Sequence, residues 1–293
     1  MPISAPCISP EPASSRPRPE PQDVMTQLSV TERLLRRDRH LLVLMICALF
    51  LLAGLYTVFG VGMDMSALEM TAMRDMRDMP GVRAPGDWSA SHALLVFLMW
   101  WVMMIAMMLP SVAPTVLLNA AMLRHTEDAD RVAELCSVFL AGYLVAWAGF
   151  SLVAASVQWA LEAAGVVSAT MMTLIDTVPG GLLLIVTGVF QFSSLKAACL
   201  AHCRAPIKFL TERRKPGVRG AFLMGLEHGT YCLACCWFLM ALLFVGGIMN
   251  LIWIVGLAAF VALERLSPWG ETASRVAGVV LILWGVVILG GLI

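Results

Sequence analysis

Long apolar stretches recur along the 293-residue chain and are separated by short polar connections. A helix that rises 1.5 Å per residue needs about 20 apolar residues to cross a bilayer. The pattern therefore predicts an all-α fold, a polytopic transmembrane helix bundle of about seven spans. The fifth and sixth spans are joined by so few residues that they could instead form a re-entrant hairpin. The predicted spans are 41–61, 91–110, 136–158, 178–195, 221–243, 246–263 and 274–292.

Basic residues are distributed unequally between alternate connections. If the spans alternate strictly, 17 of the 20 Lys and Arg residues fall on the side of the N-terminus, and only Arg74, Arg77 and Arg83 lie opposite. Because Lys and Arg concentrate in cytoplasmic loops, we expect a cytoplasmic N-terminus and an outside C-terminus in a bacterial inner membrane. The formal net charge is zero, so charge indicates no nucleic-acid partner, and the lipid bilayer is the expected environment.

Polar segments divide the chain further. Residues 1–38 are rich in Pro, Ser and charge and predict a disordered cytoplasmic tail, which leaves 39–293 as the transmembrane domain. Within that domain, 196–219 is a basic cytoplasmic loop and 62–90 is an outside loop rich in methionine. These methionines suggest loading or release of Cu(I), or equally an amphipathic segment that dips into lipid. They are Met63, Met65, Met70, Met73, Met76 and Met79.

Cysteine and histidine gather in two clusters. In the run EHGTYCLACCWFLM, His228, Cys232 and Cys235 are spaced i, i+4, i+7 and share one helix face, with Cys236 at its edge. The run CLAHC places Cys199, His202 and Cys203 shortly before this helix. On the cytoplasmic side thiols stay reduced, which argues against a structural disulfide framework. Thiolate and imidazole ligands favour a soft metal, Cu(I) first and zinc second.

The run WWVMMIAMMLPS adds four thioethers within the second predicted span. Met103 and Met107 share one helix face, as do Met104 and Met108. Thioethers bind Cu(I) without deprotonation and bind zinc poorly, so the four extend the candidate metal site. The alternative interpretation is that they fill space between helices. Pro110 is expected to end or kink this helix.

Other polar residues in or near the spans suggest supporting roles. A carboxylate such as Glu227 could orient a ligating histidine or move protons. Gln191 is a further polar residue in the fourth predicted span, and Glu264 is expected to be interfacial and structural. No function is assigned to the isolated Cys47 or Cys136. The chain carries no glycine-rich phosphate loop, nucleophile elbow or nucleotide fingerprint, so no enzymatic activity is expected.

The ordered motifs WWVMMIAMMLPS, QFSSLKAACLAHCRAP and GLEHGTYCLACCWFLMALLFVGGIMNLIWI, followed by a Glu–basic pair, resemble a bacterial family described as predicted metal-binding integral membrane proteins, a domain-of-unknown-function family. The resemblance covers about 95–266. This chain has Ala234 where the family pattern has Gly, and Glu264–Arg265 where it has Glu-Lys; neither change removes a candidate ligand. The resemblance implies a multi-helix membrane fold that binds metal through the Cys, His and Met positions above.

The residues favour an inner-membrane protein that binds Cu(I) and acts in copper transport or in delivery to a membrane cuproenzyme. A soluble metal donor or acceptor protein is the expected partner. A second hypothesis is a transmembrane thiol–disulfide electron carrier, in which Cys232 pairs with Cys235 or Cys236, or Cys199 with Cys203. A third is a structural subunit of a membrane complex, in which the clustered cysteines have no chemical role.

Overall fold

The computed structural model describes residues 21–291, except 64, 74 and 77–85. The described residues contain no strand, only an isolated bridge between Val167 and Leu174, which confirms the all-α prediction. The helices are α1 (Pro21–Phe59), α2 (Ala67–Ala72), α3 (Ala90–Leu123), η1 (Ala129–Arg131), α4 (Val132–Ala163), α5 (Thr177–Phe190), α6 (Ser194–Arg204), α7 (Pro206–Glu212), α8 (Gly217–Ala241), α9 (Leu243–Gly246), α10 (Leu251–Leu266) and α11 (Gly270–Leu289).

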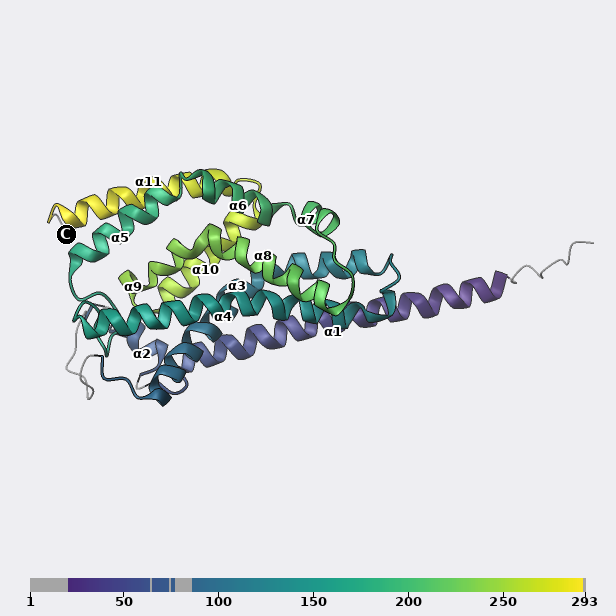
Figure 1. The fold of residues 1–293 in the computed structure, drawn as a ribbon, viewed down its shortest axis with the longest axis horizontal. Helices are drawn as coiled ribbons and strands as arrows, with labels where there is room; N and C mark the ends of the chain where they lie inside the picture. Colours follow the sequence, from purple (N-terminus) through teal and green to yellow (C-terminus); the bar gives the residue numbers. More distant parts are fainter. Residues whose placement is uncertain (1–20, 64, 74, 77–85, 292–293) are drawn as a thin grey trace, which may run out of the picture.

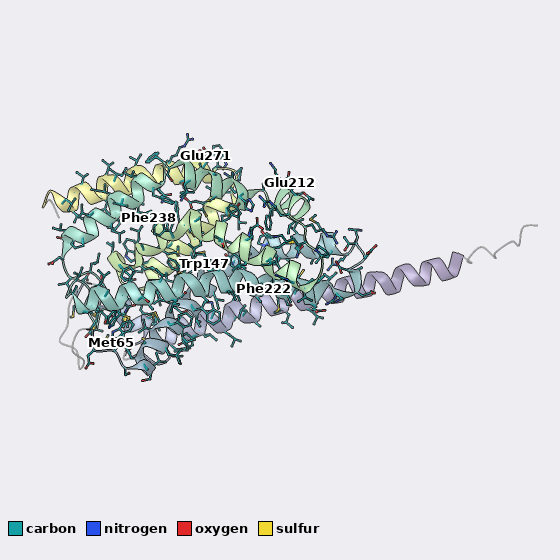
Figure 2. The ribbon with its side chains drawn as sticks, viewed as in Figure 1. Met65, Trp147, Glu212, Phe222, Phe238 and Glu271 are labelled. Carbon is teal, nitrogen blue, oxygen red and sulfur yellow. The ribbon has the colours of Figure 1, made fainter. Side chains whose placement is uncertain are left out.

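The long helices form three layers (Figure 1). Helices α1, α3 and α4 lie side by side in one outer layer, and α5 packs along α11 in the other. Helices α8 and α10 occupy the middle, where α8 packs on α4 and α10 packs on α3. Figure 2 shows Trp147 inside the bundle, where it is fully buried, while Glu212 and Glu271 lie at the periphery. The middle layer is therefore the interior of the protein.

Five helical segments are long and apolar enough to cross a membrane, and a sixth is obtained if a bent pair counts as one span. The five lie in α1, α3, η1–α4, α8–α9 and α11. The predicted span 178–195 is instead α5, which ends at Phe190 and bends by 64° into α6. The predicted span 246–263 corresponds to α10, which has 16 residues and starts at Leu251. The bend after α5 and the shortness of α10 explain why the structure has five or six segments that could cross a membrane, whereas the sequence predicted seven.

Helix α3 corrects the expectation for Pro110. The helix runs for 34 residues and passes through both Pro110 and Pro114, so Pro110 does not end it. Pro110 leaves the carbonyl of Ala106, four residues earlier, without its usual donor, and the helix still continues. The hydroxyl next to the proline bonds a different carbonyl of the same turn. Ser111 Oγ donates to the carbonyl of Met108 at 2.8 Å. The continuous helix keeps the methionines on both sides of this turn in one register.

Two glycines allow α4 and α8 to approach closely. A Cβ atom on Gly225 would lie 1.9 Å from the carbonyl oxygen of Phe139, and one on Gly142 would lie 2.2 Å from that of Phe222. Small residues at a helix interface let backbones approach, as is common between membrane helices. The close approach brings Tyr143 of α4 against Cys232 of α8.

Some predicted segments lie partly outside the described residues. Residues 1–20 of the expected tail are outside, and α1 begins at Pro21, within the segment for which we expected disorder. In the methionine-rich loop, Met79 is also outside, together with Arg74, Arg77 and Arg83. The rest of that loop contains α2, whose N-cap Ser66 forms a capping box with Glu69. The expected basic loop 196–219 contains α6 and α7.

Candidate metal centre

The two predicted Cys/His clusters lie together because α6 packs against α8. On α8, the four predicted residues are buried: His228, Cys232, Cys235 and Cys236 are at most 2% exposed. On α6, Cys199 and Cys203 are also buried, and His202 is half-buried. The sequence left open whether the fourth and fifth predicted spans touch; in the structure they do, through the short helix that follows the bend at Phe190.

Four of the thiols contact one another. Cys203 of α6 lies next to Cys235 of α8, which joins the two clusters. Cys236 reaches both Cys232 and Cys235. The Cys235 and Cys236 thiols also donate to the carbonyl of Cys232, at 3.1 and 3.0 Å. We call Cys203, Cys232, Cys235 and Cys236 the sulfur cluster.

A guanidinium group lies inside the sulfur cluster. Arg265, near the end of α10, is buried and directs Nη2 at the carbonyl of Cys232 (3.0 Å), Cys235 Sγ (3.2 Å) and Cys236 Sγ (3.7 Å). Its Nη1 donates to Ser111 Oγ at 3.1 Å, and its Nε has no partner among the described residues. A buried cation needs a compensating negative charge. The ion pairs of the described residues do not include Arg265, so the thiols are its nearest source of that charge.

Two imidazoles lie beside the sulfur cluster in an aromatic setting. The ring of His228 lies 5.4–6.0 Å from those of Phe139, Tyr143 and Phe209, and 6.4 Å from that of His202. Nδ1 of His228 and Nε2 of His202 are buried without hydrogen-bond partners in the described part of the chain. Buried polar atoms are almost always paired. Two unpaired imidazole nitrogens near one another are therefore suited to a ligand.

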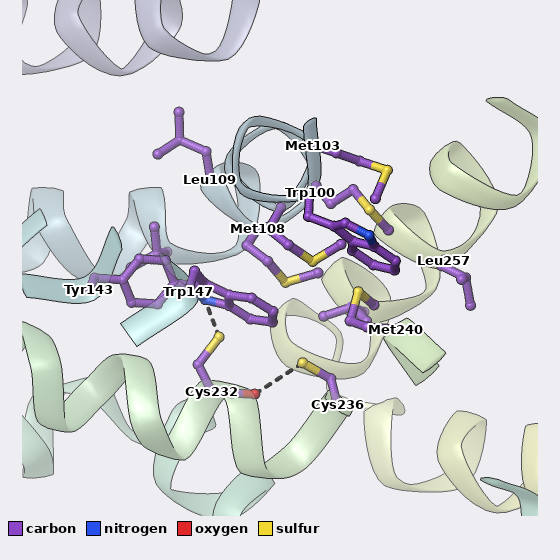
Figure 3. Close-up of a cluster of buried hydrophobic side chains, with 14 of the residues drawn as sticks. Trp100, Met103, Met108, Leu109, Tyr143, Trp147, Cys232, Cys236, Met240 and Leu257 are labelled. Carbon is purple, nitrogen blue, oxygen red and sulfur yellow. Dashed lines mark hydrogen bonds between the residues drawn. The ribbon is translucent and has the colours of Figure 1, made fainter. Parts of the chain in front are cut away.

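Thioethers continue the sulfur-rich interior away from α6. Met103, Met104, Met107 and Met108 of α3 are at most 2% exposed, as is Met240 of α8. Figure 3 shows the thioethers of Met103, Met108 and Met240 gathered beside Trp100, with the thiols of Cys232 and Cys236 at the border of the same space. Helices α3 and α8 thus contribute soft donors to one interior region, a contact that the methionine spacing alone left open.

Tyr143 and Arg265 are the main site residues that sequence reasoning missed. The Tyr143 hydroxyl lies 2.9 Å from Cys232 Sγ, with either atom able to donate. Arg265 was assigned to a cytoplasmic connection because it follows an apolar run. Its position directly after Glu264, at the end of that run, was the available signal, since ionisable residues within membrane segments usually have partners and functions.

A family model for copper chaperones, PpoB2, matches residues 97–288. The chain belongs to this family of copper chaperones. The matched region contains both clusters, the α3 methionines and Arg265, so the soft donors lie within the family's own domain. No curated protein and no solved structure matches the chain.

The donors of this copper chaperone are gathered but not arranged around a single point. Among the described residues, no group of three or more His, Cys, Asp or Glu side chains has the geometry to hold a metal ion. The thiols instead direct their hydrogen bonds at one another and at the Cys232 carbonyl, and Arg265 lies between them. Coordination of a metal by these thiols therefore requires side-chain rotations. His, Cys, Asp and Glu are the four side-chain types concerned, and methionine thioethers are not among them.

Two carboxylates differ from expectation. Glu264 was expected at the interface, but it is 1% exposed and forms an ion pair with Lys196 of α6 at 2.7 Å. Lys196 also donates to Gln191, and Ser274 donates to the same amide oxygen. Desolvation makes an unpaired charge costly, which explains why Lys196 is paired inside the bundle rather than free in the basic loop.

Glu227 is the second of these carboxylates. It pairs with Arg213 at 3.4 Å and Lys215 at 3.7 Å, on the segment between α7 and α8. No hydrogen bond joins it to His228 among the described residues, and Nδ1 of that histidine is unpartnered. The orientation of the ligating histidine by Glu227 stays a prediction.

Proposed function

We propose that this copper chaperone is an integral membrane protein that binds Cu(I) at the sulfur cluster and delivers it to a membrane cuproenzyme. The observation that carries the proposal is the contact of four buried thiols from α6 and α8, next to thioethers from α3 and α8. Thiolate and thioether sulfur selects Cu(I) over harder cations. Zinc, the second choice, binds thioethers poorly and gains nothing from the methionines.

Charge supports a monovalent metal. In the apolar interior, two thiolates and one Cu(I) carry a net charge of −1, which the guanidinium of Arg265 neutralises. The same two thiolates with Zn²⁺ are already neutral, and Arg265 then leaves an uncompensated positive charge. Because uncompensated charge is costly in a low-dielectric interior, Arg265 favours Cu(I) at a two-thiolate site.

The location of the cluster suggests how copper reaches it. We propose seven membrane crossings, counting α5–α6 as one and the short α10 as another, with the N-terminus in the cytoplasm of a bacterium. This orientation places α6 and α7 near the cytoplasmic surface, where six basic residues lie between 204 and 219. A soluble donor protein could then deliver Cu(I) at α6. Delivery is favoured over bulk transport by the family description.

Metal content tests the proposal. The full chain, purified in detergent under reducing conditions, is incubated with Cu(I) and Zn²⁺ in competition and analysed by mass spectrometry. We expect copper to exceed zinc, and Cys232→Ser/Cys235→Ser/Cys236→Ser to lose about one equivalent of copper. Cys47→Ser/Cys136→Ser is the matched control, because both residues lie away from the cluster, and it should retain full loading. Equal copper in all three proteins would overturn the proposal.

The thiol–disulfide electron carrier makes a different prediction for the same proteins. Exchange between two cysteines is abolished by removing either one, whereas a site with several ligands loses affinity in steps. Single serine variants at Cys203, Cys232 and Cys235 should therefore each bind Cu(I) with reduced affinity. If each of these single-substitution variants keeps its copper affinity but loses disulfide exchange completely, the electron carrier is favoured.

A further inference from the structure

A cavity of about 470 Å³ opens at the end of the bundle that carries α2 and α9. Three methionines from separate segments line it: Met70 of α2, Met76 after that helix, and Met171 in the connection between α4 and α5. One carboxylate, Asp75, lines the same space. Nine residues separate Val245 at this cavity from Cys236, or roughly 13 Å of helix, so the cavity is separate from the sulfur cluster.

Two of the three segments that present these methionines are anchored, whereas Met76 follows α2 and is 51% exposed. The capping box of Ser66 and Glu69 starts α2, and the backbone N–H of Leu251 donates to Thr71 Oγ1 at 2.8 Å, which ties α2 to the start of α10. Ser66 and Thr71 thereby fix the helix that carries Met70, which is 5% exposed. The cavity wall therefore belongs to the folded bundle.

Met171 is held by a second set of contacts. Its neighbour Met172 has a φ of 51°, and the N–H of Ile248 donates to the Met172 carbonyl at 3.1 Å. A positive φ at a residue other than glycine persists only where the surroundings determine it. The thioether of Met171, 4% exposed, is thus placed at the cavity by the backbone around it.

We propose that this cavity is a second Cu(I) site, with the thioethers of Met70, Met76 and Met171 as ligands and Asp75 as the compensating charge. The proposal rests on the proposed copper-binding function. Thioether sulfur is neutral and soft, so it binds Cu(I) without releasing a proton and discriminates against zinc. The carboxylate balances the single positive charge. The stacked rings of Trp253 and Trp284, 5.8 Å apart, also line the cavity and add cation–π attraction.

The cavity and the sulfur cluster differ in their ligands in a way that suits transfer of Cu(I) from one to the other. Thioethers give a neutral ligand set with rapid exchange, whereas the sulfur cluster offers ionisable thiols next to Arg265. Met240 lies on the same face of α8 as Cys232 and Cys236. It follows Cys236 by about one helical turn and Cys232 by about two, and its side chain is fully buried. Copper held at the cavity therefore has soft donors between it and the sulfur cluster. The cavity acts as a holding site at the far end of the bundle from α7.

Methionine-to-leucine substitution tests the cavity, since it removes sulfur while keeping volume and apolar character. The starting protein is the full-length Cys232→Ser/Cys235→Ser/Cys236→Ser variant, in detergent, titrated with Cu(I) against a chromophoric Cu(I) chelator. We expect this variant to retain about one equivalent of Cu(I). Adding Met70→Leu/Met76→Leu/Met171→Leu should remove that equivalent, whereas adding the control pair Met45→Leu/Met122→Leu should leave it. Thermal unfolding of all proteins confirms that each is folded.

Two results would overturn the cavity site: no Cu(I) bound by the cysteine variant, or residual binding that survives the three leucines. Failure of the proposed function is distinguishable, because it is measured in the opposite background. Met70→Leu/Met76→Leu/Met171→Leu with all cysteines intact should still bind the equivalent that depends on Cys232, Cys235 and Cys236. If the cysteine variant binds no Cu(I), the cavity site is absent. If the three-leucine variant with intact cysteines binds no Cu(I), the site at the sulfur cluster is absent.

Discussion

Arg265 Nη2 lies 3.2 Å from Cys235 Sγ, which makes a guanidinium–thiol contact in the interior of a bundle with five helical segments long and apolar enough to cross a membrane. Arg265 comes from the end of α10, and Cys235 from the middle of α8. The charge of arginine persists at any physiological pH. Stable burial of this residue therefore requires electron-rich partners, and the sulfur cluster supplies them.

Replacing Arg265 with methionine should weaken Cu(I) binding by about 10- to 100-fold, the range seen when groups that support metal ligands are removed. The physical reason is that the Cu(I)–thiolate complex loses its compensating charge. Arg265→Lys keeps the charge but loses the planar contacts, so its loss should be smaller. Competition with a Cu(I) chelator measures both affinities.

Zinc provides the control for that interpretation. If Arg265 acts through charge, Arg265→Met should weaken Cu(I) binding more than Zn²⁺ binding, and the preference for copper should fall. An unchanged ratio of the two affinities would show that Arg265 only packs against the thiols.

The grouping of soft side chains on single helix faces could be predicted from the sequence because their spacing is local. His228, Cys232 and Cys235 share a face of any helix that includes them, and Met103 and Met107 do likewise. The partners could not be predicted, because they depend on how distant helices pack. Nothing within α10 indicates that Arg265 reaches α8, 30 residues earlier, or that Lys196 reaches Glu264.

The buried pair of Lys196 and Glu264 predicts a stability effect. Lys196→Met and Glu264→Gln each remove one charge of the pair and leave the other buried without its partner. Each should therefore lower the free energy of unfolding by about 3–5 kcal/mol. The double variant Lys196→Met/Glu264→Leu should recover most of the loss. Unfolding in detergent checks this, and similar losses in the single and double variants would refute it.

The exposed pair of Glu271 and Arg275 is the matched control. The two side chains are 2.7 Å apart but more than 60% exposed. Solvent-exposed pairs contribute little, about 0–1 kcal/mol. Glu271→Gln should therefore leave the unfolding midpoint nearly unchanged.

Gly225→Ala should separate α8 from α4. The added methyl group would meet the Phe139 carbonyl at 1.9 Å, and backbone cannot move aside as a flexible side chain can. We expect a lower unfolding temperature and weaker Cu(I) binding, because Tyr143 would leave Cys232. Gly256→Ala, whose methyl group would meet nothing within 4 Å, should have neither effect. Equal behaviour of the two alanine variants would contradict the observed packing.

The bend within the predicted span 178–195 also has a physical origin that hydropathy does not reveal. The apolar run 178–195 looks continuous, yet Ser193 caps a new helix by accepting from Lys196 N, and the chain bends there. The bend carries Cys199 and Cys203 across to α8. Hydropathy alone cannot distinguish such a bend from a straight span, since both bury the same residues.

The α3 methionines should govern the rate of copper movement more than its final binding. Met103→Leu/Met108→Leu keeps the packing volume but removes two thioethers from the interior region that Cys232 and Cys236 border. We expect Cu(I) loading at equilibrium to stay within about twofold, and the rate of transfer to an acceptor chelator to fall. Stopped-flow transfer measurements give that rate. An unchanged rate would indicate that these methionines only fill space.

X-ray absorption at the copper edge of the stoichiometrically loaded, full-length protein tests the central claim most directly. The account predicts a Cu(I) edge and a first shell dominated by sulfur. In Cys232→Ser/Cys235→Ser/Cys236→Ser the thiolate contribution should fall, because Cys203 is the one thiol of the sulfur cluster that remains. A first shell of oxygen and nitrogen, or a sulfur shell that the three serines leave unchanged, would contradict Cu(I) binding at the sulfur cluster.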